Sequence, residues 1–146
     1  MKTILCYGSL KSGFHNNYRL GEKAVFLGFR TVLGIMYLHH NYPKLYKPTD
    51  KPLNNGLQKY HNCEIWQIND DTYNDIKKME LYEGYEEETI ETGWDKKTGI
   101  FWMPWKNFND KDIPILEYNY NVLDKNTKEY LEKYANPKPF KIHPQS

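Results

Sequence analysis

Arginine, cysteine and long apolar runs are scarce in this sequence, and each scarcity argues against a class of protein. The 20 basic residues, of which only Arg19 and Arg30 are arginines, are balanced by 19 acidic ones, giving a net charge of +1. Such a balance provides no basic patch for nucleic acid or an anionic membrane. No apolar stretch approaches the roughly 20 residues of a membrane span, and the N-terminus lacks the apolar region of a signal peptide. We therefore expect a cytoplasmic protein that binds neither nucleic acid nor membrane.

The few cysteines and histidines are too scattered for a disulfide framework or a metal centre. Cys6 and Cys63 lie in apolar, strand-like segments, where a buried reduced thiol is the usual state. His39 and His40 are neighbours, so on a strand they point to opposite faces, and the segment around Cys63 has no second pair of ligands. We predict no metal site. A nucleophilic pair of Cys6 with His15 is the alternative to a core position for Cys6, and the core position is favoured.

The chain has the length of a single domain, residues 1–146, with many short β-prone runs. Residues 95–98 indicate a hairpin turn, and residues 47–56 indicate a surface loop. These features predict an α+β fold with a small, mostly antiparallel, barrel-like sheet and one main helix. The expected strands are residues 3–7, 24–38 with breaks at Gly28 and Gly34, 41–48, 61–68, 86–94, 99–105 and 115–123.

The main helix is expected over residues 71–83. Asp70 or Asp71 can cap its start, and Gly84 is a natural stop. A short second helix is predicted from Asp124 or Asn126 through residue 134. The tail from about residue 136, which contains three prolines, is expected to pack over the surface or to be loose. One apolar face of the main helix is marked by a three-residue repeat of Tyr73, Ile76, Met79 and Tyr82.

A glycine-containing turn, YGSLKSGFHNN at residues 7–17, follows the first strand. Gly8 and Gly13 have the spacing of a Walker A loop, whose backbone N–H groups bind phosphate. That motif requires Lys and then Ser or Thr after the second glycine, and Phe14 and His15 stand there instead. The turn is therefore predicted to bind something other than a nucleotide.

The main helix ends in MELYEGY, which places Glu83 in its last turn. The helix C-terminus carries partial negative charge, and Glu80 and the three glutamates at 86–88 add more. Each disfavours ionisation of Glu83, and a carboxyl with a raised pKa is what a general base near neutral pH requires. The alternative is an exposed carboxylate that tolerates a poor position at small cost.

Together the two motifs resemble the γ-glutamylcyclotransferase superfamily, most closely its γ-glutamylamine cyclotransferase-like (AIG2-like) branch. That branch has the patterns Y-G-[ST]-L-x-x-G-x-x-N and L-[DE]-x-x-E-G-Y, matched here from Tyr7 to Asn16 and from residue 79 to residue 85. The similarity covers roughly residues 3–105 and includes the Tyr-Pro pair of "VFLGFRTVLGIMYLHHNYPKLYK". Met79 stands where the branch commonly has Leu, and Glu80 where it commonly has Asp.

The resemblance implies a six-stranded, barrel-like α+β fold and an enzyme without a cofactor. The family cyclises a γ-glutamyl group to 5-oxoproline and releases its amine or amino acid. In the family the glutamate of E-G-Y is the acid/base, which implies Glu83 here. The Y-G-[ST]-L loop binds the small-molecule substrate, which implies that role for Tyr7, Gly8, Ser9 and Leu10. The candidates for a substrate-contacting tyrosine from the last strand are Tyr118 and Tyr120, and neither is assigned to the site.

Two other functions use the same residues. One is a non-catalytic module that binds a small carboxylate or a glutamyl side chain, against which the retained glutamate argues. The other is a different acyl-transfer or amide-cleaving step on the same scaffold. The sequence leaves the leaving amine and the oligomeric state open.

Overall fold

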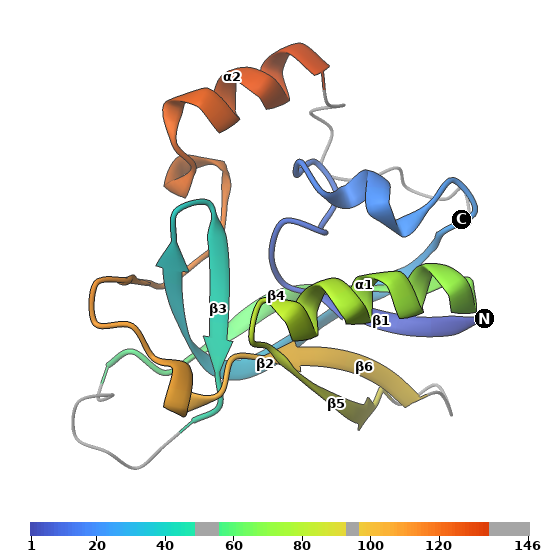
Figure 1. The fold of residues 1–146 in the computed structure, drawn as a ribbon, viewed down its shortest axis with the longest axis horizontal. Helices are drawn as coiled ribbons and strands as arrows, with labels where there is room; N and C mark the ends of the chain where they lie inside the picture. The colour runs from blue at the N-terminus through green and yellow to red at the C-terminus, as the bar shows by residue number, and fades with distance from the viewer. Residues whose placement is uncertain (49–55, 93–96, 135–146) are drawn as a thin grey trace.

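The computed structural model describes residues 1–48, 56–92 and 97–134, which form one sheet and two α-helices (Figure 1). Helix α1 spans Asp70–Tyr82 and α2 spans Lys125–Tyr134, and short 3-10 helices lie at Asn17–Leu20 (η1), Trp105–Asn107 (η3) and Tyr120–Val122 (η4). This is the α+β fold that the sequence predicts. The strands are β1 (Lys2–Cys6), β2 (Val25–His39), β3 (Tyr42–Tyr46), β4 (Lys59–Ile68), β5 (Glu86–Glu91), β6 (Lys97–Trp102) and β7 (Ile113–Ile115).

The sheet has the order β3-β2-β4-β1-β6-β5, and the short β7 also pairs with β2. Among the described strands, every pair is antiparallel except β1 with β6. Just beyond β6, the Met103 N–H donates to the Leu45 carbonyl in β3 over 2.8 Å. This bond joins elements near opposite ends of the strand order, so the sheet curls toward a barrel. With β7 it has seven strands rather than the six expected.

Strand β2 is one continuous element of 15 residues, and the predicted break at Gly34 is wrong. Gly34 stays in register with β4, and a Cβ there would lie 2.7 Å from Leu45 Cδ1 and 2.9 Å from the Tyr46 carbonyl oxygen. Glycine is needed at this position because β3 approaches closely, and beyond it β2 leaves β4 and pairs with β3 and β7 instead. At Gly28, by contrast, the register with β4 shifts in a bulge, as expected there.

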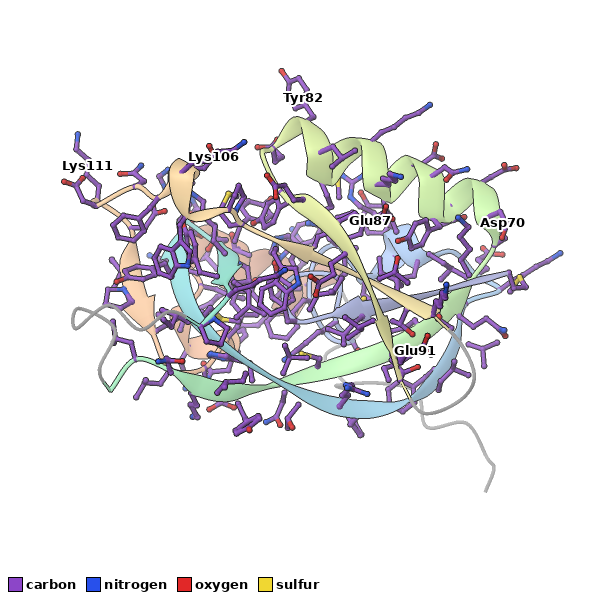
Figure 2. All side chains as sticks on the ribbon, turned by 90° about the horizontal axis from the view of Figure 1, so that it is seen from below. Asp70, Tyr82, Glu87, Glu91, Lys106 and Lys111 are labelled. Atoms are coloured by element: carbon purple, nitrogen blue, oxygen red, sulfur yellow. The ribbon has the colours of Figure 1, made fainter. Side chains whose placement is uncertain are left out.

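Helix α1 packs on the sheet through Tyr73 and Ile76, which are buried against β1, β4 and β6. Its N-cap is Asn69, whose side chain accepts from the Thr72 N–H at 2.8 Å, and not the predicted Asp70 or Asp71. Tyr82 is 89 % exposed, and Figure 2 shows it pointing away from the sheet at the opposite end of the helix from Asp70. A three-residue step falls short of a helical turn, so Tyr82, nine residues after Tyr73, lies about 180° around the helix.

The predicted strand at 115–123 is wrong. β7 ends at Ile115, and the chain continues into η4, where the Asn119 side chain accepts from the Asn121 N–H at 2.9 Å. This local bond competes with strand pairing. Tyr118 is buried and donates to the Asn41 carbonyl at 2.7 Å.

Strands β5 and β6 pair as the predicted hairpin, but residues 97–98, placed in its turn, belong to β6. Residues 49–55 of the predicted loop, residues 93–96 and the tail from 135 lie outside the described residues. The second helix follows its prediction closely, with Asp124 accepting from the Thr127 N–H at 2.8 Å. No described helix is both long and apolar enough to cross a membrane.

Candidate active site

A cavity of about 350 Å³ lies between the end of β1, the start of β3 and the C-terminal end of α1. Its lining includes every site residue predicted from the sequence, namely Tyr7, Gly8, Ser9, Leu10 and Glu83. The fold therefore brings together two motifs that lie about seventy residues apart in the chain.

The turn after β1 is held by its own side chains. The Asn16 side chain donates to Ser9 Oγ at 2.8 Å, and its backbone N–H donates to the Ser9 carbonyl at 3.0 Å. Asn17 Nδ2 donates to the Leu10 carbonyl at 2.8 Å, and Gly13 takes a positive φ of 83°. The asparagine of the first motif thus fixes the shape of the turn that lines the cavity.

A buried glutamate ties this turn to the sheet. Glu64 of β4 is only 5 % exposed, and its Oε1 accepts from the Ser12 N–H at 2.8 Å and from Trp66 Nε1 at 2.9 Å. Sequence reasoning missed this role. The signal in the sequence is that Glu64 is a charged residue within an otherwise strand-like run. A carboxylate buried in a sheet requires hydrogen-bond partners, so its position indicates a structural role.

Pro43 is the point where three parts of the cavity wall meet. A Cβ on Gly8 would lie 2.6 Å from Pro43 Cγ, so the turn can approach the β2–β3 hairpin only with glycine at that position. The Tyr85 hydroxyl donates to the Pro43 carbonyl at 2.9 Å. Tyr7 is buried beneath them, and its hydroxyl donates to the Phe101 carbonyl.

Glu83 is the C-cap residue of α1, one position beyond the last turn in which the sequence placed it. The Gly84 N–H donates to the Leu81 carbonyl at 3.1 Å, and the Tyr85 N–H donates to the Glu80 carbonyl at 3.0 Å. With Gly84 at φ 94°, this is a Schellman motif, which turns the chain sharply and leaves the Glu83 side chain exposed on the cavity. The conformation of Gly84 therefore allows both of its neighbours, Glu83 and Tyr85, to line the cavity.

The raised carboxyl pKa in this cavity belongs to Glu80. This side chain is half-buried, and burial, followed by the charge of Glu83, raises its pKa from 4.5 to about 7. Sequence reasoning treated Glu80 only as a charged neighbour of Glu83. Its surroundings come from elsewhere in the chain: Cys6 and Tyr7, at the end of β1, lie close enough to interact with Glu80, and the MELYEGY motif contains neither.

On the side of the cavity formed by the β2–β3 hairpin, here called the hairpin wall, His39 and Lys44 form a hydrogen-bonded cluster with Asp112. Asp112 Oδ1 lies 2.7 Å from His39 Nδ1, and its Oδ2 accepts from Lys44 Nζ at 2.9 Å. The Asp112 side chain is 2 % exposed, and burial alone would raise its pKa, but the bonds from Lys44 and His39 lower it. His39 and Lys44 line the cavity, as does Arg19 of η1.

Cys6 and the two late tyrosines are not placed to react. Cys6 is 2 % exposed, and burial, with Glu64 next, raises the pKa of its thiol well above the usual value. A thiol held protonated is a poor nucleophile, which favours the core position. Tyr118 and Tyr120 are not among the lining residues, and Tyr120 donates to Glu132 on the surface. Tyr42 and Tyr85 line the cavity instead.

Among residues 1–48, 56–92 and 97–134, no three His, Cys, Asp or Glu side chains are grouped so as to hold a metal ion.

Comparison with known proteins gives one family match and several structural ones. A family model described as "Gamma-glutamyl cyclotransferase, AIG2-like" matches residues 4–122. No curated protein is significantly similar in sequence.

The structural matches share the fold at low identity. An uncharacterized protein from Pyrococcus horikoshii has a TM-score of 0.61 and 18 % identity over 81 % of this chain and 90 % of its own. An AIG2-like protein from Mus musculus has a TM-score of 0.58 and 18 % identity over 82 % and 89 %. Allophanate hydrolase from Kluyveromyces lactis has a TM-score of 0.61 and 15 % identity over 78 % of this chain but 19 % of its own length.

Proposed function

Because the chain belongs to the AIG2-like gamma-glutamyl cyclotransferase family, we propose that it cyclises a γ-glutamyl group to 5-oxoproline and releases the attached amine. The observation that carries this proposal is the shared cavity, in which Glu83 and the turn from Tyr7 to Leu10 face the same space. Its volume of about 350 Å³ suits a small donor, at the lower end of the roughly 300–1,000 Å³ of small-molecule sites.

The reaction needs a base more than it needs a nucleophile on the protein. The donor's own α-amine attacks the γ-carbonyl carbon, so a new C–N bond forms as the amide C–N bond breaks. The amine must lose a proton and the leaving nitrogen must gain one, and Glu83 can carry that proton between them. Ring closure is intramolecular, so holding the donor folded supplies much of the acceleration.

The turn after β1 supplies the fixed dipoles. Negative charge develops on the γ-oxygen during attack, and backbone N–H groups between Gly8 and Leu10 are suitable donors to it or to the donor's carboxylate. The bonds from Asn16, Asn17 and Glu64 hold these groups before substrate arrives. A rigid site of this kind costs little reorganisation as the charge forms.

The two free, buried cysteines fit a reducing cytoplasm, where we place the enzyme.

The test is to incubate the full chain with γ-glutamyl alkylamides, γ-glutamyl amino acids and glutathione and to measure 5-oxoproline by mass spectrometry. We expect product from at least one donor and a loss of about 10²- to 10⁴-fold in kcat/KM for Glu83→Gln, the usual effect of losing a general base. Glu91→Gln is the matched control, because Glu91 is exposed on β5 and does not line the cavity.

Two outcomes would contradict the proposal. Near wild-type turnover by Glu83→Gln would remove Glu83 from the mechanism. Binding of 5-oxoproline without turnover of any donor, tighter in Glu83→Gln, would instead support a non-catalytic carboxylate-binding module.

A further inference from the structure

Glu80 lies on the buried face of α1 and lines the same cavity as Glu83. It follows the buried Tyr73 by seven residues, so it lies only about 20° from that side chain around the helix. Glu83, three residues further on, lies about 60° from Glu80, which makes the two carboxyls neighbours on one face. Unlike the exposed Glu83, Glu80 is half-buried.

We propose that Glu80 is a second catalytic carboxyl, which donates a proton to the leaving nitrogen while Glu83 accepts the proton of the attacking amine. This inference rests on the proposed function and divides its proton transfers between two residues. A single carboxylate would have to reach two different nitrogens in turn, whereas two neighbouring carboxyls can each serve one.

The surroundings of Glu80 favour a carboxyl that keeps its proton. Burial removes water that would solvate the anion, and the adjacent Glu83 adds like charge, so the pKa of Glu80 is about 7. Two carboxyls with different environments can serve as an acid and a base at one pH. The titratable or charged groups that share the cavity with Glu80 are Glu83 of α1, Cys6 and Tyr7 at the end of β1, Tyr85 after the helix, Arg19 of η1, His39 of β2, Tyr42 and Lys44 of β3.

Protons and bonds balance over the cycle. The α-amine gives its proton to Glu83 as its nitrogen bonds to the γ-carbon. The amide C–N bond then breaks, and its electron pair goes to the leaving nitrogen, which takes up the proton of Glu80. Transfer of the proton from Glu83 to Glu80, directly or through water, restores the starting state.

The experiment compares Glu80→Gln with wild type on two donors that differ in their need for protonation. A γ-glutamyl alkylamide releases a strongly basic amine, with a pKa of about 10 as for lysine, and its nitrogen must be protonated to leave. γ-Glutamyl-p-nitroanilide releases p-nitroaniline, whose departure depends much less on the strength of the proton donor, because the nitro group stabilises charge that develops on the leaving nitrogen and water can supply the proton. Gln is uncharged and similar in size to a protonated Glu but cannot deliver a proton.

We expect Glu80→Gln to lose about 10²-fold or more in kcat/KM on the alkylamide and at least about tenfold less than that on the p-nitroanilide. The alkylamide profile of the wild type should fall as pH rises above about 7, and the variant should lack that limb. Asp75→Asn, on the exposed side of the same helix, is the control and should match wild type on both donors. Thermal unfolding of each variant checks that it is folded.

Equal losses on both donors, or no loss on either, would overturn the role of Glu80 while leaving cyclisation intact. A wild type that turns over neither donor would instead defeat the proposed function and this inference with it. If Glu80→Gln fails to fold, Glu80→Asp replaces it. Asp keeps a proton donor at a shorter reach, so its loss should again be selective for the alkylamide, and an unselective loss would overturn the proposal.

Discussion

The two walls of the cavity arrange charge in opposite ways. At the end of α1, Glu80 and Glu83 place like charges side by side, and burial raises the pKa of Glu80 to about 7. On the hairpin wall, where His39 of β2 and Lys44 of β3 line the cavity, Lys44 and His39 bond to Asp112 and lower the pKa of its carboxyl. Burial favours the protonated form of both carboxyls, and their partners decide the direction of the net shift.

The two arrangements suit different roles, proton transfer at the end of α1 and stabilisation of the fold around Asp112. A carboxyl that is buried beside another carboxyl gains from taking up a proton, which is a useful property for proton transfer. A carboxylate bonded to both Lys44 and His39 is satisfied, and it joins the segment before β7 to β2 and β3. We therefore expect substitutions on the helix wall to affect the reaction and those on the hairpin wall to affect stability.

Asp112→Asn should have the largest effect on stability. It leaves Lys44 in a nearly buried position without its anion, and removing one partner of a buried pair costs about 3–5 kcal/mol. Urea unfolding at pH 7 measures this loss, and Asp110→Asn, an exposed neighbour, should change it little. Unchanged stability combined with lost cyclisation would break the comparison, because the hairpin wall would then be part of the chemistry.

Glu80→Gln should raise stability in alkaline solution, with a smaller effect. The folded state holds the Glu80 proton up to about pH 7, whereas the unfolded chain releases it near 4.5, so wild type loses stability as pH rises between these values. The amide does not titrate, so its advantage should grow over that range by at most about 3 kcal/mol, at 1.36 kcal/mol per pKa unit. Unfolding at pH 4 and pH 8 tests the sign. An advantage that grows toward low pH would contradict the assignment of the raised pKa.

His39→Phe should have the smallest of these effects. His39 is 43 % exposed and contributes one bond to Asp112, while Lys44 keeps the other, so the loss should be about 1 kcal/mol. In a double-mutant cycle, the same change on the Asp112→Asn background should cost almost nothing. Full cost on that background would show that His39 acts through contacts other than Asp112.

The sequence predicted best where the determinants are local. Helix α1 begins within one residue of its prediction and stops at Gly84, because its period and its terminal glycine are both visible in the chain. The turn at residues 7–10 and Glu83 were predicted as a site from the resemblance of their two motifs to the family, and these motifs are also local in the chain. The strand at 115–123 failed because alternation there resembled a strand, while Asn119 formed a local bond that favours a turn.

Long-range features could not be read in this way. The His39–Asp112 contact joins residues 73 positions apart, and nothing in either segment indicates the other. The raised pKa of Glu80 depends on burial by other elements, so composition around the motif directs attention to Glu83 instead. Gly34 was read as a break because the sequence shows only the glycine, and the close approach of β3 that requires it comes from another part of the chain.

The capped ends of α1 also limit how this protein can change over evolutionary time. Asn69 fixes the start of the helix and Gly84, with its positive φ, fixes its end, and the helix Asp70–Tyr82 has 13 residues. One inserted or deleted residue would turn Glu83 by about 100° relative to the Tyr73 contact on the sheet. The exposed positions of the helix are therefore free to drift in identity, whereas its length is not free to vary. We therefore expect related proteins to differ in the exposed residues of this helix but not in the number of residues between the contact at Tyr73 and the carboxyl of Glu83.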